Sequence, residues 1–187
     1  MPSAGLEAVL DAFFGERGWT PPRAWGGPLV TFPDGTETRT IPTFAWHLDI
    51  LPGQRLDPWP DVVRVFALLA PLTPGGGGTL YVAGAHRLAM DLVGRRRATL
   101  RSTKLREAMK RASPWIAALC APGEEPERTR RLMAEGADLG GLALRVGEIT
   151  GEAGDIYLMH PGMLHAPAPN RRATPRIMLA ETICANC

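Results

Sequence analysis

A histidine and an aspartate stand two residues apart, at His47 and Asp49, in the stretch Trp46-His47-Leu48-Asp49. Residues i and i+2 of a β-strand point to the same face of the sheet, so a strand here would present an imidazole and a carboxylate side by side. These are two of the three ligands in the two-histidine, one-carboxylate set of non-heme iron sites, which leaves coordination positions open. Because a His-x-Asp pair also occurs at polar strand edges, a metal site requires a third ligand from elsewhere in the chain.

The third ligand is expected among the remaining histidines, His86, His160 and His165. His86 follows a Gly-Ala pair in an expected turn and has no partner at ligand spacing, which favours a structural role. His160 and His165 lie five positions apart with Pro161-Gly162 between them, so one strand face cannot present both. The spacing alone leaves either of these two histidines as the third ligand.

Three segments follow one another in an order typical of a single enzyme family. The first is His47-Leu48-Asp49, and the second is the glycine-rich stretch 77–87, GGTLYVAGAHR. The third is the most specific because its residues fall at fixed offsets, and it comprises Gly154-Asp155, His160-Pro161, His165, Asn170 and Arg176. With these motifs, which cover about residues 40–183, the sequence resembles the phytanoyl-CoA dioxygenase-like family of Fe(II)/2-oxoglutarate oxygenases.

The resemblance implies that His47, Asp49 and His165 hold iron, with His160 as a neighbouring structural group. It also implies that Arg176 pairs with the distal carboxylate of 2-oxoglutarate, for which the planar guanidinium offers a fork of donors. The expected cofactors are therefore Fe(II) and the cosubstrate 2-oxoglutarate. The expected activity is that of a dioxygenase that hydroxylates a small organic substrate and releases succinate and CO2. A carboxylate at position 49 favours hydroxylation, because halogenating relatives carry a small residue there.

The sequence departs from the family pattern in three places. Family members often carry a hydroxyl residue two positions after the distal histidine, where this chain has Pro167. The family's Pro-Gly-Ser-His turn is Ala83-Gly84-Ala85-His86 here, and only 46 residues precede His47. Two alternatives therefore stay open: a metal-binding jelly-roll module without turnover, and a cupin-like metalloenzyme that does not use 2-oxoglutarate. Dependence on 2-oxoglutarate would separate the three hypotheses.

Short apolar or alternating runs between Gly- and Pro-rich turns predict a mainly β chain. The expected strands lie at about 29–32, 41–51, 62–69, 79–82, 142–149, 155–160, 164–165 and 176–182. About eight short strands are typical of a jelly roll, and the resemblance implies the same cupin-like double-stranded β-helix. The expected fold class is therefore mainly β with flanking helices, in a single domain over residues 1–187.

Two regions show helical spacing of apolar residues instead. Residues 5–15 predict an amphipathic helix near the N-terminus. Residues 88–136 interrupt the β pattern and predict a helical insertion, broken at Pro114. Insertions of this kind often cover active sites, so this one could serve as a lid.

Two polar residues in the expected strand 79–82 could contact 2-oxoglutarate. Thr79 and Tyr81 share one face of this strand, opposite to Leu80 and Val82. Both would reach the cosubstrate if their face lines the interior, and the opposite orientation is equally compatible with the sequence. The preceding glycine run, 75–78, predicts a tight turn rather than a phosphate-binding loop, because no Gly-Lys-Ser/Thr follows it.

The composition argues against several classes of partner. The net charge is +2 and 21% of residues are charged, so no strong field attracts nucleic acid or a membrane surface. The longest apolar run, about residues 65–72, is far shorter than the ~20 residues of a membrane-spanning helix, and no signal peptide is visible. Three cysteines do not indicate a disulfide framework. We therefore expect a cytoplasmic enzyme that acts on a small molecule with dioxygen, while the substrate and the oligomeric state have no recognisable signature.

Three local clusters have ordinary interpretations. The arginines at 95–97 and 128–131 are typical of a solvated face, with contact to an anionic substrate group as the alternative. Cys184 and Cys187 form a C-x-x-C pair at the C-terminus, where nothing nearby completes a four-ligand zinc site. We interpret them as thiols on a frayed tail, with a redox or metal role as the alternative.

Overall fold

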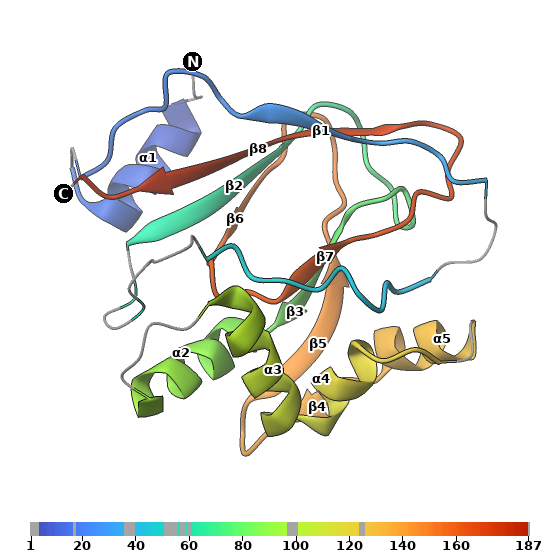
Figure 1. The fold of residues 1–187 in the computed structure, drawn as a ribbon. Coiled ribbons are helices and arrows are strands. Elements are labelled where there is room, and N and C mark those ends of the chain that lie inside the picture. Colours follow the sequence, from blue (N-terminus) through green and yellow to red (C-terminus); the bar gives the residue numbers. More distant parts are fainter. Residues whose placement is uncertain are drawn as a thin grey trace.

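Two four-stranded antiparallel sheets form the centre of the molecule (Figure 1). The computed structural model describes residues 4–16, 18–35, 40–50, 56, 59, 61–96, 101–123 and 126–186. Sheet I has the order β1 (Gly27–Thr31), β8 (Arg176–Cys184), β2 (Val62–Leu68), β6 (Ile156–Met159). Sheet II has the order β4 (Ala137–Asp138), β5 (Ala143–Glu148), β3 (Thr79–Ala83), β7 (His165–Pro167). With several helices beside them, the two sheets are compatible with a β-sandwich.

The space between the sheets is filled by alternate side chains of both. Phe66 of β2 and Met178 of β8 belong to one buried cluster, and Tyr81 of β3 packs against it from sheet II. These residues define the inner faces of the sheets. Since side chains alternate along a strand, Arg64 and Arg176 lie on the same inner face of sheet I as Phe66 and Met178.

The strand β2 is buried on both faces, as its continuous apolar run predicts. Its outward-facing residues Val63 and Val65 pack against Leu6 and Leu10 of helix α1 (Ala4–Phe14). Helix α1 therefore covers the outer face of sheet I, and its position matches the amphipathic helix expected at 5–15 (Figure 1).

The remaining helices lie between β3 and β4 in the chain, in the region where an insertion was expected at about 88–136. They are α2 (Ala85–Arg96), α3 (Ser102–Ala112), α4 (Pro114–Leu119) and α5 (Glu127–Ala134). Leu80 and Val82 of β3 share a buried cluster with Leu105 and Met109 of α3, on the side of sheet II that faces away from sheet I. The helices therefore pack on the outer face of sheet II, and a role as a lid stays a prediction.

The strand expected at 41–51 is not formed in its described part, residues 41–50. Only an isolated antiparallel bridge joins His47 to His165 at the β7 edge of sheet II. Among the described residues the segment has one strand, β7, as a neighbour, and the chain bends at residues 43–44, where Phe44 is 86% exposed. The other expected strands correspond to β1, β2, β3, β5, β6, β7 and β8, with ends shifted by a few residues.

The turn from β3 into α2 requires a glycine at position 84. Gly84 has φ +83°, and a Cβ there would lie 2.3 Å from the carbonyl oxygen of Ala143. We expect Gly84→Ala to lower the free energy of unfolding by about 3 kcal/mol, from left-handed strain plus the backbone contact. The matched variant Gly154→Ala has φ +96° but open space around the new Cβ, and should lose only about 1 kcal/mol. Urea denaturation of both variants checks this, and equal losses would show that the approach to Ala143 is unimportant.

Candidate metal centre

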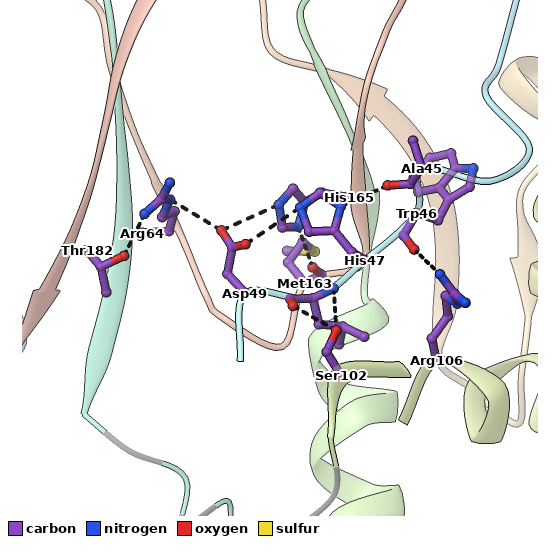
Figure 2. A network of polar contacts seen from close by, with 11 residues as sticks. Ala45, Trp46, His47, Asp49, Arg64, Ser102, Arg106, Met163, His165 and Thr182 are labelled. Atoms are coloured by element: carbon purple, nitrogen blue, oxygen red, sulfur yellow. Dashed lines mark hydrogen bonds and ion pairs between the residues drawn. The ribbon is translucent and has the colours of Figure 1, made fainter. Parts of the chain in front are cut away.

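Three side chains predicted as ligands come together at the open edge of sheet II (Figure 2). One ligand atom from each of His47, Asp49 and His165 lies within 4.8 Å of the others. Asp49 Oδ1 is 3.6 Å from His47 Nε2, and Asp49 Oδ2 is 3.5 Å from His165 Nε2. Among the described residues, this is the one group of three or more such side chains with metal-binding geometry.

The backbone places the two imidazoles on one face. His47 N donates to His165 O at 2.9 Å, and His165 N donates to His47 O at 3.0 Å. Such a reciprocal pair sets two residues directly opposite each other in an antiparallel ladder. Trp46 and Leu48 are 1% and 3% exposed on the other face, so the alternation directs His47 and Asp49 toward the site.

Both histidines present the same ring nitrogen to the site. His47 Nδ1 lies 2.8 Å from Ala45 O, and His165 Nδ1 lies 2.9 Å from Met163 O. A carbonyl oxygen can only accept, so each Nδ1 carries the proton and each Nε2 keeps its lone pair in the neutral ring. This second hydrogen bond orients metal-binding histidines in many proteins.

Burial differs sharply around the group. The His165 side chain is 5% exposed, while Asp49 is 27% and His47 is 45% exposed. Burial lowers the pKa of His165, and the charge of Asp49 opposes this effect. His165 therefore stays neutral, which is the form that binds metal. The group opens to solvent on the side of His47.

The three residues fit a metal ion. Bonds of about 2.1 Å at right angles would place neighbouring ligand atoms about 3.0 Å apart. The two pairs between a histidine and Asp49, at 3.6 and 3.5 Å, are slightly longer than this, and all three ligand atoms lie within 4.8 Å of one another. Two imidazoles and a carboxylate suit iron and several other divalent metals, and the donor set by itself does not select among them.

Helix α3 supports the ligand-bearing segment from its outer side. The backbone groups of Leu48 point away from β7, and the hydroxyl of Ser102 satisfies both of them. It accepts from Leu48 N at 3.2 Å and donates to Leu48 O at 2.9 Å. Arg106 Nη1 also donates to Trp46 O at 2.9 Å. These side chains take the place of a further strand (Figure 2).

Sequence reasoning missed Arg64, which contacts the group from sheet I. Its Nε lies 3.2 Å from Asp49 Oδ2, and its Nη1 donates to Thr182 Oγ1 at 2.6 Å. The signal in the sequence is a single charge within the apolar run VVRVFAL. Sequence reasoning also missed Ser102 and Arg106, for which the sequence contains no specific signal.

His160 is not part of the ligand group. Its ring packs against Trp59 and His86 at centroid distances of 5.1 and 5.4 Å, and its Nδ1 accepts from Gly162 N at 3.0 Å. Burial, with a smaller contribution from His86, lowers the pKa of His160 to about 4. His86 lies in the first turn of helix α2 rather than in the isolated turn that was expected, and burial, then Arg87, lowers its pKa too.

Arg176 is a buried cation at the start of β8. It is 7% exposed, and burial lowers its pKa. Its Nη1 lies 2.7 Å from the sulfur of Met178, its Nη2 donates to the Thr31 hydroxyl, and its Nε has no hydrogen-bond partner. Within the described ranges, no carboxylate pairs with this guanidinium.

Thr79 and Tyr81 lie on the inner face of sheet II, which the sequence had left open. Tyr81 is directly opposite His165 in the β3–β7 register, and Thr79 is opposite Pro167. The Tyr81 ring extends the other way, over Gly147 of β5, where an added Cβ would lie 2.6 Å from its hydroxyl. Thr79 is thus near the distal histidine strand, whereas the Tyr81 hydroxyl leans away from it.

The other clusters noted in the sequence have mixed outcomes. Arg128 is buried and donates to the carbonyls of Ile41 and Leu119, so it is structural rather than solvated. Arg130 is exposed and pairs with Glu127. Cys184 is exposed and forms no disulfide with a described residue, while Cys187 and the arginine side chains at 95–97 lie outside the described residues. No helix in the described part of the chain combines the length and apolar character needed to cross a membrane.

No model of a known protein family matches this chain, and no curated protein matches its sequence. The family resemblance therefore stays a prediction.

The two hydrogen bonds between the Ser102 hydroxyl and the Leu48 backbone can be tested for their effect on metal binding. We expect Ser102→Ala to weaken Co(II) or Mn(II) binding roughly 10- to 100-fold, because the ligand segment loses its outer support. Ser102→Thr keeps the hydroxyl and should bind nearly as well as the natural protein. Ser113→Ala serves as the matched control, since it removes the N-cap of α4 at the opposite end of α3 from Ser102. It should cost about 1 kcal/mol of stability and leave metal affinity unchanged. Equal metal binding by Ser102→Ala and the natural protein would contradict the bracing role.

The low pKa of His160 predicts how stability changes with pH. Between its ordinary value of 6.5 and about 4, the unfolded chain takes up a proton that the folded chain does not. The free energy of unfolding should therefore fall as the pH drops through this window. His160→Asn keeps an acceptor for Gly162 N and cannot titrate, so its stability should fall less steeply. Urea midpoints from pH 4 to 8 measure both slopes, and parallel curves would contradict the assignment.

Proposed function

We propose that the protein is a non-heme Fe(II)/2-oxoglutarate-dependent dioxygenase that hydroxylates a small organic substrate. The observation that carries the proposal is the buried cation Arg176, on the inner face of the sheet opposite the metal ligands. A set of three metal ligands alone is compatible with many activities. Together with a buried guanidinium that has no carboxylate partner, it favours a ligand with two carboxylates, one for the metal and one for the guanidinium.

The strand order supports a jelly roll, the fold that the resemblance implies. Along the chain, β1 lies in sheet I, the His47 segment in sheet II, β2 in sheet I, and β3 and β5 in sheet II. The chain then returns to sheet I with β6, to sheet II with β7, and to sheet I with β8. Eight segments distributed in this way between two antiparallel sheets agree with the double-sheet arrangement of jelly rolls.

The surroundings of Arg176 favour an anionic ligand. A buried charge without a partner is costly, and a thioether sulfur is a weak acceptor for a guanidinium. A carboxylate could accept two parallel hydrogen bonds from this group and neutralise it. Along β8, Met178 and Ala180 separate Arg176 from Thr182, which faces Arg64 beside the metal ligands. One end of a dicarboxylate at Arg176 would direct its other end toward the metal.

Thr79 could replace the hydroxyl that the family often carries at position 167. Pro167 stands at that position, but Thr79 lies directly opposite it on the neighbouring strand and on the same inner face. Thr79 is also buried. Its hydroxyl could therefore act with Arg176 on the distal carboxylate, so the departure at Pro167 does not argue against 2-oxoglutarate.

In the proposed enzyme, each residue has a limited task. His47, Asp49 and His165 would hold the ion, and Arg176 with Thr79 would hold the distal carboxylate of 2-oxoglutarate. Bound iron and 2-oxoglutarate would supply the oxidising power, with dioxygen consumed and succinate and CO2 released. The protein would contribute orientation and the exclusion of water.

An anaerobic titration with Fe(II) and then 2-oxoglutarate tests the proposal. We expect a visible metal-to-ligand charge-transfer band that is lost in His47→Ala and in Asp49→Ala, because each variant removes one of three ligands. Succinate production should be lost with it. If iron binds without the band, a cupin-like metalloenzyme or a silent metal-binding module replaces the proposal.

Arg176→Gln tests the cosubstrate part separately. We expect the 2-oxoglutarate concentration at half-maximal band intensity to rise about 10- to 100-fold, the equivalent of roughly 1.5–3 kcal/mol for a charge-assisted pair. Iron affinity should not change. Arg172→Gln is the matched control, because Arg172 is exposed and donates to Pro74 O. If the 2-oxoglutarate concentration at half-maximal band intensity is unchanged in Arg176→Gln, a cation other than Arg176 binds the distal carboxylate.

A further inference from the structure

Arg64 is a charged residue within an otherwise apolar strand. Its neighbours Val63, Val65 and Phe66 are 4% exposed or less, while the Arg64 side chain is 26% exposed. An apolar residue on the inner face would pack in the same strand without the cost of removing a guanidinium from water. The fold therefore gives no reason for a cation here, and its place beside Asp49 points to the site.

The guanidinium is fixed by two contacts and retains one free nitrogen. Nε faces Asp49 Oδ2 at 3.2 Å, and Nη1 donates to Thr182 Oγ1 at 2.6 Å, as Figure 2 shows. Nη2 has no hydrogen-bond partner among the residues that the structure describes. The Phe66 ring lies against the guanidinium, with Arg64 Cζ 5.7 Å from the ring centroid. A cation held in this way is preorganised to bind a further anion.

The charges around the proposed centre leave one positive charge in excess. Arg64 cancels the negative charge of Asp49, so a divalent ion keeps both of its charges. The two negative charges of 2-oxoglutarate balance the ion, and Arg176 then adds one positive charge that nothing in the described part of the chain cancels. A monoanionic group close to Arg64 would restore neutrality.

A second cation lies on the inner face of sheet II, toward the same open end. Arg145 shares its face of β5 with Gly147, opposite to the buried Leu144 and Val146, and is exposed. It has no ionic partner within the described ranges. Along the neighbouring strand β3, its register partner Ala83 is two positions beyond Tyr81, which is opposite His165. An anion that approaches the open end therefore meets positive charge from both sheets.

We propose that the substrate carries a carboxylate and that Arg64 binds this carboxylate beside the metal. The inference rests on the proposed function, because the charge excess arises only with a divalent ion and 2-oxoglutarate in place. A planar, singly charged carboxylate matches both the excess charge and the geometry of a guanidinium edge. Arg64 is thus the residue that selects acids over neutral substrates.

Fluorine NMR of small probes tests the subsite without knowledge of the substrate. The protein is loaded with Zn(II), which is not redox-active, and with 2-oxoglutarate. Para-fluorophenylacetate is compared with para-fluorophenylacetamide, which has the same shape without the charge, and with para-fluorophenyl phosphate. We expect the acid to bind at least about tenfold more tightly than the amide and the phosphate. Equal binding of acid and amide, or preference for the phosphate, would overturn the carboxylate assignment.

Variants assign the effect to Arg64. Arg64→Met has a similar length and suits an apolar strand, and it should lose the preference for the acid about tenfold or more. Arg64→Lys keeps the charge and should retain part of the preference, and Arg172→Met should retain all of it. Unchanged acid binding in Arg64→Met would refute the proposal. If Arg64→Met does not fold, the natural protein still tests where the acid binds. With Mn(II) in place of Zn(II), the fluorine signal of the bound acid must broaden if the acid lies beside the metal.

The result for the carboxylate subsite at Arg64 can be distinguished from the result for the proposed dioxygenase function. Acid binding near the metal without the charge-transfer band would leave the subsite standing and remove 2-oxoglutarate. A normal band with no preference for acids would keep the dioxygenase and remove the subsite. If Arg64→Met instead raises the 2-oxoglutarate requirement and leaves acid binding intact, Arg64 serves the cosubstrate and the proposal is wrong.

Discussion

The reciprocal hydrogen bonds between His47 and His165 are the contact on which the rest of the site depends. They join two residues 118 positions apart and set them opposite each other in an antiparallel pair. Once this register is set, the alternation of side chains brings Asp49 to the same face without any further contact. The anchoring is asymmetric, because β7 is part of a sheet whereas no strand of the described residues lies on the outer side of the His47 segment. Burial of Trp46 and Leu48 and the hydroxyl of Ser102 supply what that missing strand would have provided.

The two sheets divide the site by charge. Sheet II and its edge carry the two imidazoles and the carboxylate, which are electron donors to a cation. Sheet I carries Arg64 and Arg176 on its inner face, and both are held by hydroxyl groups, of Thr182 and Thr31. Neutral hydroxyls orient a guanidinium without neutralising it. Arg64 also pairs with Asp49, whereas no described carboxylate pairs with Arg176. The charge of Arg176 is therefore uncompensated among the described residues, and an anionic ligand gains from both this charge and the low polarity around it.

The sequence predicts the parts of this arrangement that follow from local periodicity. His47 and Asp49 share a face because the side-chain period of an extended chain is two, and this holds although no strand forms there. The family resemblance implies His165 rather than His160 as the third ligand, and the structure groups His165 with His47 and Asp49. Contacts across the chain are a different matter. The hydroxyl of Ser102 acts on a residue 54 positions away, and a serine at a helix start has no feature that specifies such a partner. Helical spacing likewise shows that α3 has an apolar face, but not which side of sheet II that face covers.

The exposure of the ligands suggests an order of events in the proposed enzyme. His165 is buried and His47 is nearly half exposed, so the centre is approached from the side of His47. Arg64 and Arg145 lie toward that open end, whereas Arg176 is three inward-facing positions further along β8 from the partner of Arg64. A ligand bound at Arg64 would stand between solvent and the deeper site. A dicarboxylate destined for Arg176 must therefore enter before an anionic substrate occupies Arg64. The excess charge favours the same order, because the centre still carries one excess positive charge after 2-oxoglutarate has bound, and this charge attracts the anionic substrate.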